Sequence, residues 1–276
     1  MRCALSLFLL IPPAVAAYGQ TALTPQQAQA LVERALATES HAAQDFQTNH
    51  PMRYRLHKSS PRLTTTKEIA ETKDGDVARL IAVNDQPLDA AGELQEQARL
   101  DELLSNPSLQ QHRKQSEEND TERALKVLRV LPTAFLYQYA GGGAGPSGPV
   151  EKFTFRPNPQ FNPPDIETGV LTAMAGEIWV DPAQERVVRL AGSLQQDKEL
   201  ALGLVALDKG GWVEIEQADV GGHQWRIVHL KLLMNTRVLF KSKSSNSDQV
   251  YSQFAPLPAN LSYQDAIKLL RGGANK

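Results

Sequence analysis

Hydrophobic and polar positions along the chain predict a central hairpin in residues 170–190. Residues 170–180 are apolar and end in Ile-Trp-Val, which favours a pleated surface. The Asp-Pro pair at 181–182 ends this strand, because proline cannot donate to a ladder. Residues 186–190 then run back with β-branched side chains. The pattern therefore predicts two antiparallel strands joined by a tight turn.

Short runs of the same kind predict further strands on both sides of this hairpin. Towards the N-terminus they lie at 52–58, 64–73, 76–83, 135–139 and 151–156. Towards the C-terminus they lie at 211–220, 224–234, 236–241 and 249–254, with a polar hairpin loop at 242–248. Residues 200–207 are apolar and fit either a strand or a helix.

Helical spacing of apolar residues predicts helices before and between these strands. Thr24 and Pro25 open a long amphipathic helix that ends by residue 50, since threonine caps well and proline fits the first turn. Asp89 caps a helix to about residue 104, a third helix begins at residue 120 or 121, and Ser262 caps a last one. The segment 109–119 is almost wholly polar, which predicts a solvated helix or a mobile linker.

This order of elements predicts an α+β fold, in which one long antiparallel sheet carries the helices on one face. We expect residues 21–276 to form a single domain. Residues 1–20 have the pattern of a cleaved signal peptide, with a positive start, a short apolar run and small residues that place cleavage within 16–20. The mature protein is then expected in the periplasm or outside the cell.

Composition excludes several classes of site and partner. The one cysteine, Cys3, precedes the apolar run, so the mature chain would hold neither a disulfide nor a thiolate metal site. The formal net charge is −2 and no basic patch is evident, so we expect no nucleic-acid partner. No later apolar run is long enough to cross a membrane, and we expect a soluble monomer.

Candidate catalytic motifs each have a simpler explanation. Residues 143–148 match G-x-G-x-x-G, but the prolines and the β-pattern after them exclude the helix that a dinucleotide site needs, so 141–150 is predicted to be a flexible surface loop. Glu214 and Glu216 share one strand face, as the solvent side of a sheet would. The six histidines lack metal-ligand spacing. We therefore expect no catalytic residues, no metal and no cofactor.

Apolar strand residues are the candidates for a ligand site. If the sheet and its helices enclose a groove, we expect it to be lined by Met174, Ile178, Val180, Leu190, Ile215 and Trp225. The same residues would equally form an ordinary filled core beneath the helices, which is the default for such side chains. The sequence leaves this choice open.

Several segments resemble the outer-membrane lipoprotein carrier superfamily, the LolA/LolB-like proteins, and more closely its uncharacterised secreted bacterial members. The resemblance lies in the long first helix and in residues 153–164, 176–190, 209–217 and 251–254. It implies a half-barrel, meaning a curved antiparallel sheet whose concave face is covered by helices around a cavity for acyl chains. The chain departs from the carriers by a helical insertion at about 89–131 and by lacking a lipobox cysteine.

Two functions are compatible with this sequence. The resemblance implies a secreted or periplasmic protein that carries or binds an acyl chain, a lipid or a lipidated protein. The alternative is a non-catalytic envelope scaffold or protein-interaction module. The two differ in whether the interface between sheet and helices is a cavity or a filled core.

Overall fold

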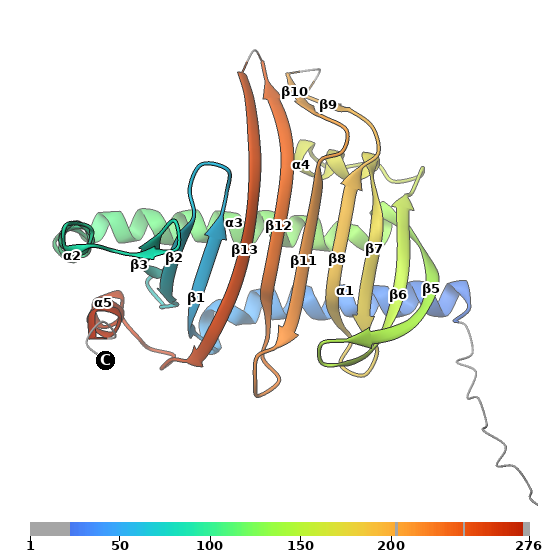
Figure 1. The fold of residues 1–276 in the computed structure, drawn as a ribbon. Helices are drawn as coiled ribbons and strands as arrows, with labels where there is room; N and C mark the ends of the chain where they lie inside the picture. Colours follow the sequence, from blue (N-terminus) through green and yellow to red (C-terminus); the bar gives the residue numbers. More distant parts are fainter. Residues whose placement is uncertain (1–22, 202–203, 240, 273–276) are drawn as a thin grey trace, which may run out of the picture.

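The fold is an open, curved antiparallel sheet with helices packed against one face (Figure 1). The computed structural model describes residues 23–201, 204–239 and 241–272, with side chains except at 45–49. The predicted signal peptide at 1–20 lies outside the described residues. Within them, thirteen strands form one sheet in the order β4-β3-β2-β1-β13-β12-β11-β8-β7-β6-β5, with β10 paired to β12 and β9 paired to β10. The predicted α+β class is confirmed.

The helical elements are α1 (Pro25–Asn49), α2 (Ala90–Ser105), α3 (Pro107–Ala134), α4 (Ile166–Gly169), the 3-10 helix η1 (Val170–Ala173) and α5 (Tyr263–Gly272). The strands before the central hairpin are β1 (Met52–Ser59), β2 (Thr65–Ala70), β3 (Val77–Val83), β4 (Gln86–Pro87), β5 (Phe135–Gly145) and β6 (Gly148–Pro157). The hairpin itself is β7 (Met174–Asp181) and β8 (Arg186–Leu194), so its first strand begins later than predicted. The remaining strands are β9 (Lys198–Leu200), β10 (Val205–Leu207), β11 (Trp212–Asp219), β12 (Trp225–Val238) and β13 (Lys241–Pro256).

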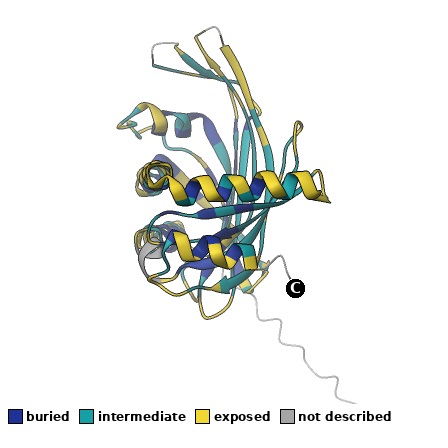
Figure 2. Ribbon diagram, turned by 90° about the vertical axis from the view of Figure 1, so that its left-hand side faces the viewer, coloured by how far each residue is buried: buried dark blue, intermediate teal, exposed yellow. Residues whose placement is uncertain are grey.

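Two separate cores fill the space between the sheet and the helices. The α1 core packs the buried stripe of α1, from Ala28 to Leu36, against β5, β6, β7 and β8. The α5 core packs α2 and α5 against β2 and β3 at the other end of the sheet. Figure 2 shows the long helices that are seen end-on to one side of the sheet, while other helices cross in front of its near end. The middle of the sheet, between these cores, is covered chiefly by α3.

The predicted start of a third helix at residue 120 or 121 is wrong, because α3 begins at Pro107 and runs unbroken. The polar segment 109–119 is rich in Gln, Lys, Arg and Glu, which are good helix formers. Its side chains also hold the turn between β2 and β3. Gln110 Nε2 donates to the carbonyl of Gly75 over 2.8 Å, and Lys114 Nζ donates to the carbonyl of Lys73 over 3.1 Å.

The glycine-rich segment predicted as a flexible loop is instead sheet. Gly141–Gly145 belongs to β5 and pairs with β6, leaving only a tight turn at 146–147. A Cβ atom on Gly143 would lie 2.6 Å from Cε of Lys152, and one on Gly145 would lie 2.5 Å from Cγ1 of Val150. The glycines therefore let neighbouring side chains lie across the bare strand.

The polar loop predicted at 242–248, and the break predicted before 236, are also wrong. β12 runs unbroken to Val238, and β13 pairs with it from Lys241 onwards. Ladder hydrogen bonds use only backbone groups, so a polar strand forms where its partner supplies the ladder. Both strands are largely exposed near this end, which removes the alternation that marks a half-buried strand.

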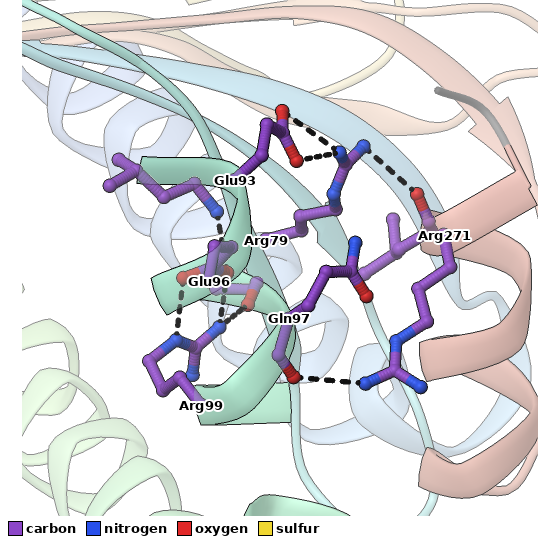
Figure 3. Close-up of polar contacts among 9 residues, drawn as sticks. Arg79, Glu93, Glu96, Gln97, Arg99 and Arg271 are labelled. Carbon is purple, nitrogen blue, oxygen red and sulfur yellow. Dashed lines mark hydrogen bonds and ion pairs between the residues drawn. The ribbon is translucent and has the colours of Figure 1, made fainter. Parts of the chain in front are cut away.

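A polar network fastens α2 and α5 to β3 (Figure 3). The buried Arg79 on β3 donates to both carboxylate oxygens of Glu93 on α2, over 3.0 and 3.3 Å, and to the carbonyl of Leu270 on α5, over 3.2 Å. Glu96 accepts from the Leu80 backbone N–H over 2.9 Å and from Arg99. These bonds fix the two helices that form the α5 core.

We predict that Arg79→Met lowers the free energy of unfolding by about 2–3 kcal/mol, because three charge-assisted bonds are lost and a buried carbonyl is left unpaired. Urea unfolding monitored by circular dichroism measures this. Arg156→Met, at an exposed position of β6, is the control and should change stability by less than about 0.5 kcal/mol. Equal effects of the two substitutions would contradict the structural role of Arg79.

Candidate functional site

A cavity of about 930 Å³ lies between the two cores. Its floor is the middle of the sheet, where β1, β13, β12, β11 and β8 each contribute side chains. Its roof is one face of α3 from Lys114 to Leu131, and the later part of α1 adds Leu36, Ala42 and Ala43. This volume is within the range of roughly 300–1,000 Å³ that is usual for small-molecule sites.

One row of paired residues leads across the sheet from the α1 core into the cavity. Phe153 on β6 pairs with Ile178 on β7, Ile178 with Leu190 on β8, and Leu190 with Ile215 on β11. Phe153 and Ile178 are fully buried, with 0% exposure, whereas Leu190 and Ile215 are half-buried and line the cavity. The change follows the edge of the α1 core: Phe153 and Ile178 belong to that core, Leu190 packs against it while only partly buried, and Ile215 lies beyond it.

The structure divides the six residues predicted to line a groove into two groups. Leu190, Ile215 and Trp225 line the cavity. Met174, Ile178 and Val180 lie in the α1 core, where their exposure is 7%, 0% and 0%. Since Ile178 and Val180 share that core with α1, they face the helical layer as their strand alternation predicts.

The part of the cavity next to the α1 core is apolar. The later part of α3 supplies Ala124, Val127, Leu128 and Leu131 to the roof. Val187, Leu190 and Ile215 lie on the sheet side. A surface of this kind offers no hydrogen bonds and gains free energy only by burying apolar groups.

The part next to the β2–β3 turn is polar and was not predicted from the sequence. Glu71 and Asp76 come from this turn, Glu117 from α3, Tyr54 from β1 and Arg226 from β12. Glu71 accepts from the Met52 backbone N–H over 2.8 Å, and Glu117 accepts from the Asp76 backbone N–H over 2.9 Å. These five residues are called the polar end below.

Desolvation shifts the pKa values at the polar end. Burial, reinforced by the charges of Glu117 and Glu71, raises the pKa of Asp76 well above its ordinary value. Burial also raises the pKa of Glu71 and Glu117. It lowers the pKa of Arg226 to about 10, against the opposing effect of Glu71. All four shifts disfavour the charged form, as expected where ions lose water without full compensation.

A buried ion pair marks the boundary between the α1 core and the cavity. Glu39 on α1 accepts from Nε and Nη2 of Arg186 on β8, over 2.8 and 2.9 Å, and from the Val187 backbone N–H over 2.9 Å. The Arg186 guanidinium lies 5.5 Å from the ring of Trp225 at the start of β12. The pair therefore connects α1 with two strands of the cavity floor.

The opposite face of the sheet carries the residues that the sequence assigned to solvent. Arg189 pairs there with Glu177 and, over 2.9 Å, with Glu214, and lies 5.0 Å from the ring of Trp179. Glu216 lies 3.8 Å from Arg189. Glu214 and Glu216 therefore belong to an ionic network on a sheet surface, as their alternation predicts.

The part of the chain that the structure describes holds no cluster of three or more His, Cys, Asp or Glu residues suited to a metal ion. In the same residues, no helix has both the length and the apolar character needed to cross a membrane.

We predict that Ile178→Ala and Leu190→Ala differ in cost although the two residues are cross-strand partners. Ile178→Ala opens a void in a filled core and should lower the free energy of unfolding by about 2–5 kcal/mol. Leu190→Ala enlarges an existing space and should cost about 1–2 kcal/mol, because fewer contacts are lost. Urea unfolding of both variants tests this, and equal costs would show that the space beside Leu190 is packed.

We predict that Asp76→Asn stabilises the protein by about 1 kcal/mol at about pH 8, because it removes a desolvated carboxylate. The raised pKa means that the folded state holds this proton more tightly than the unfolded chain. The free energy of unfolding of the wild type therefore falls as pH rises from the ordinary pKa of Asp through the raised pKa of the folded state. The difference in stability between variant and wild type disappears below about pH 3, where both states hold the proton. Unfolding measured across this range tests the sign. The exposed Glu122→Gln on α3 is the control and should show no such gain.

Comparisons with known proteins add little to this geometry. No protein-family model and no curated protein matches the chain. Among solved structures, the chain is similar to a putative outer membrane lipoprotein-sorting protein domain from Vibrio parahaemolyticus. The identity is 9% and the TM-score 0.32, over 90% of this chain and 100% of that one. A likeness at this level carries no weight for function. The structure shows the α+β class that the resemblance to the lipoprotein carriers implied, and the rest of that resemblance stays a prediction.

Proposed function

We propose that this protein is a non-catalytic binding protein whose cavity holds the alkyl chain of a lipid or of a lipidated protein. The observation that carries the proposal is the cavity of about 930 Å³ between two filled cores, with an apolar half formed by α3, β8 and β11. A sheet fully sealed by its helices would instead have favoured the scaffold.

The energetics of an alkyl chain suit the apolar half. Each methylene group that leaves water contributes about 0.8 kcal/mol. Association costs about 4–15 kcal/mol, so a chain of many carbons is needed for net binding. The cavity crosses five strands of the sheet, and its apolar half provides an extended surface for such a chain. That half offers few polar groups to orient a compact polar metabolite.

The setting that we propose is the periplasm or the exterior of the cell, and we propose that the protein acts as a monomer. Support comes from the signal-peptide pattern of residues 1–20. A carrier in an aqueous compartment must shield an alkyl chain from water during transfer, and a cavity between the sheet and its helices removes the chain from water.

Fluorescence titration with Nile red, a neutral apolar dye, tests alkyl binding, and dodecanol serves as the competitor. We expect the wild type to bind the dye and dodecanol to displace it. Leu190→Trp fills the cavity and should weaken dye binding by about tenfold or more. Leu136→Trp, at an exposed position on β5 outside the cavity lining, is the matched control and should leave dye binding unchanged.

Native mass spectrometry of protein purified from its own cell envelope provides an independent readout. A co-purified lipid or acylated peptide supports the proposal. An unliganded mass, together with no dye binding by the wild type, would contradict it and favour the protein-interaction scaffold. Thermal unfolding confirms that each variant is folded before its binding is compared.

A further inference from the structure

The cavity changes from charged to apolar along α3. Lys114, Glu117 and Glu118 face it near the β2–β3 turn, and Leu131 faces it near the α1 core. The distance along the helix from the first to the last of these residues is about 25 Å at 1.5 Å per residue. A ligand with an alkyl tail in the apolar half would therefore place its head group at the polar end.

Most lining charges are already paired. The pairs are Glu39–Arg186 at 2.8 Å, Glu71–Arg226 at 3.8 Å and Glu118–Lys114 at 3.9 Å. Lys73 also lines the cavity, but it is exposed to solvent. Among the described residues, each cationic side chain that lines the cavity therefore either pairs with a carboxylate or is exposed to solvent at the rim.

Asp76 and Glu117 differ from the paired acids. Both line the cavity, and neither forms an ion pair with a described residue, although the charge of Arg113 on α3 offsets part of the rise in the pKa of each. Glu117 accepts the Asp76 backbone N–H, which holds the two residues together, while within the described chain no donor reaches the Asp76 carboxylate. Burial of these acids costs free energy that a cationic partner would offset.

Tyr54 provides a second polar group at the same place. Tyr54 is half-buried, and burial, followed by the charge of Asp76, raises its pKa well above the ordinary value. Its ring packs 5.9 Å from that of Tyr251 and 5.6 Å from that of Phe254, and it lines the cavity. Among the described residues, no hydrogen-bond partner is found for its hydroxyl, which leaves that oxygen able to accept from a ligand.

We infer that the polar end, at Asp76, Glu117 and Tyr54, selects an alkyl ligand whose head group is an ammonium ion. The inference rests on the proposed function, because the tail is held in the apolar half. A primary ammonium group has three N–H donors and no acceptor, which matches two carboxylates and one hydroxyl oxygen. A carboxylate head group would instead meet two acidic side chains. Among the described lining residues, every buried cation already pairs with a carboxylate, so none remains to neutralise such a head group.

Competition with matched twelve-carbon probes tests this. Bound Nile red is displaced by dodecylammonium, dodecanol or dodecanoate near neutral pH, with each probe below its micelle concentration. We expect dodecylammonium to displace the dye at concentrations about tenfold lower than dodecanoate, as one extra charge-assisted contact would give. In the Asp76→Asn/Glu117→Gln double variant this preference should disappear, while displacement by dodecanol stays unchanged.

The controls separate this inference from the proposed function. Glu122→Gln, on an exposed position of the same helix, should keep the preference. Glu117→Gln alone still accepts the Asp76 N–H, and it should reduce the preference if the double variant does not fold. Equal or better displacement by dodecanoate, or a preference that survives the substitutions, would overturn the inference and leave alkyl binding intact. Failure of the wild type to bind the dye or any probe would overturn the proposed function itself.

Discussion

The position of α1 on the sheet depends on a buried ion pair. Glu39 is 7% exposed, and a carboxylate taken out of water so far is tolerated only when its oxygens are fully engaged. Two bonds from Arg186 and one from the Val187 backbone N–H meet this demand. They anchor the later part of α1 to β8, directly after the apolar stripe that packs on β5 to β8, at the boundary between the filled core and the cavity.

Two cores stabilise a site that lowers stability. The cavity lacks the dense packing that normally fills the space between a sheet and its helices, and its polar end holds desolvated carboxyl groups. The α1 core and the α5 core flank it, and the Arg79 network fastens the helices of the second. A protein that keeps strained or desolvated groups at a binding site must gain stability elsewhere, and this arrangement separates the two tasks in space.

Sequence patterns predicted the strands and helices best where one face is buried and the other is in water. The central hairpin and the first helix have such faces, and both formed close to the predicted bounds. The patterns failed where this contrast is missing. The polar segment 242–248 and the glycines of β5 form strands because a neighbouring strand supplies the ladder, and that partner is known only from the tertiary structure.

The sequence by itself determined that Ile178, Leu190 and Ile215 lie on apolar strand positions, since alternation assigns each residue to a face. It could not determine which of them meets a packed helix, because all three have the same chemistry. The tertiary structure decided this by ending the α1 core at β8 and placing α3 above the next strands. The polar end was hidden for the same reason. Tyr54, Asp76 and Glu117 are distant in sequence, and each alone has the pattern of an ordinary half-exposed residue until the fold places all three around one cavity.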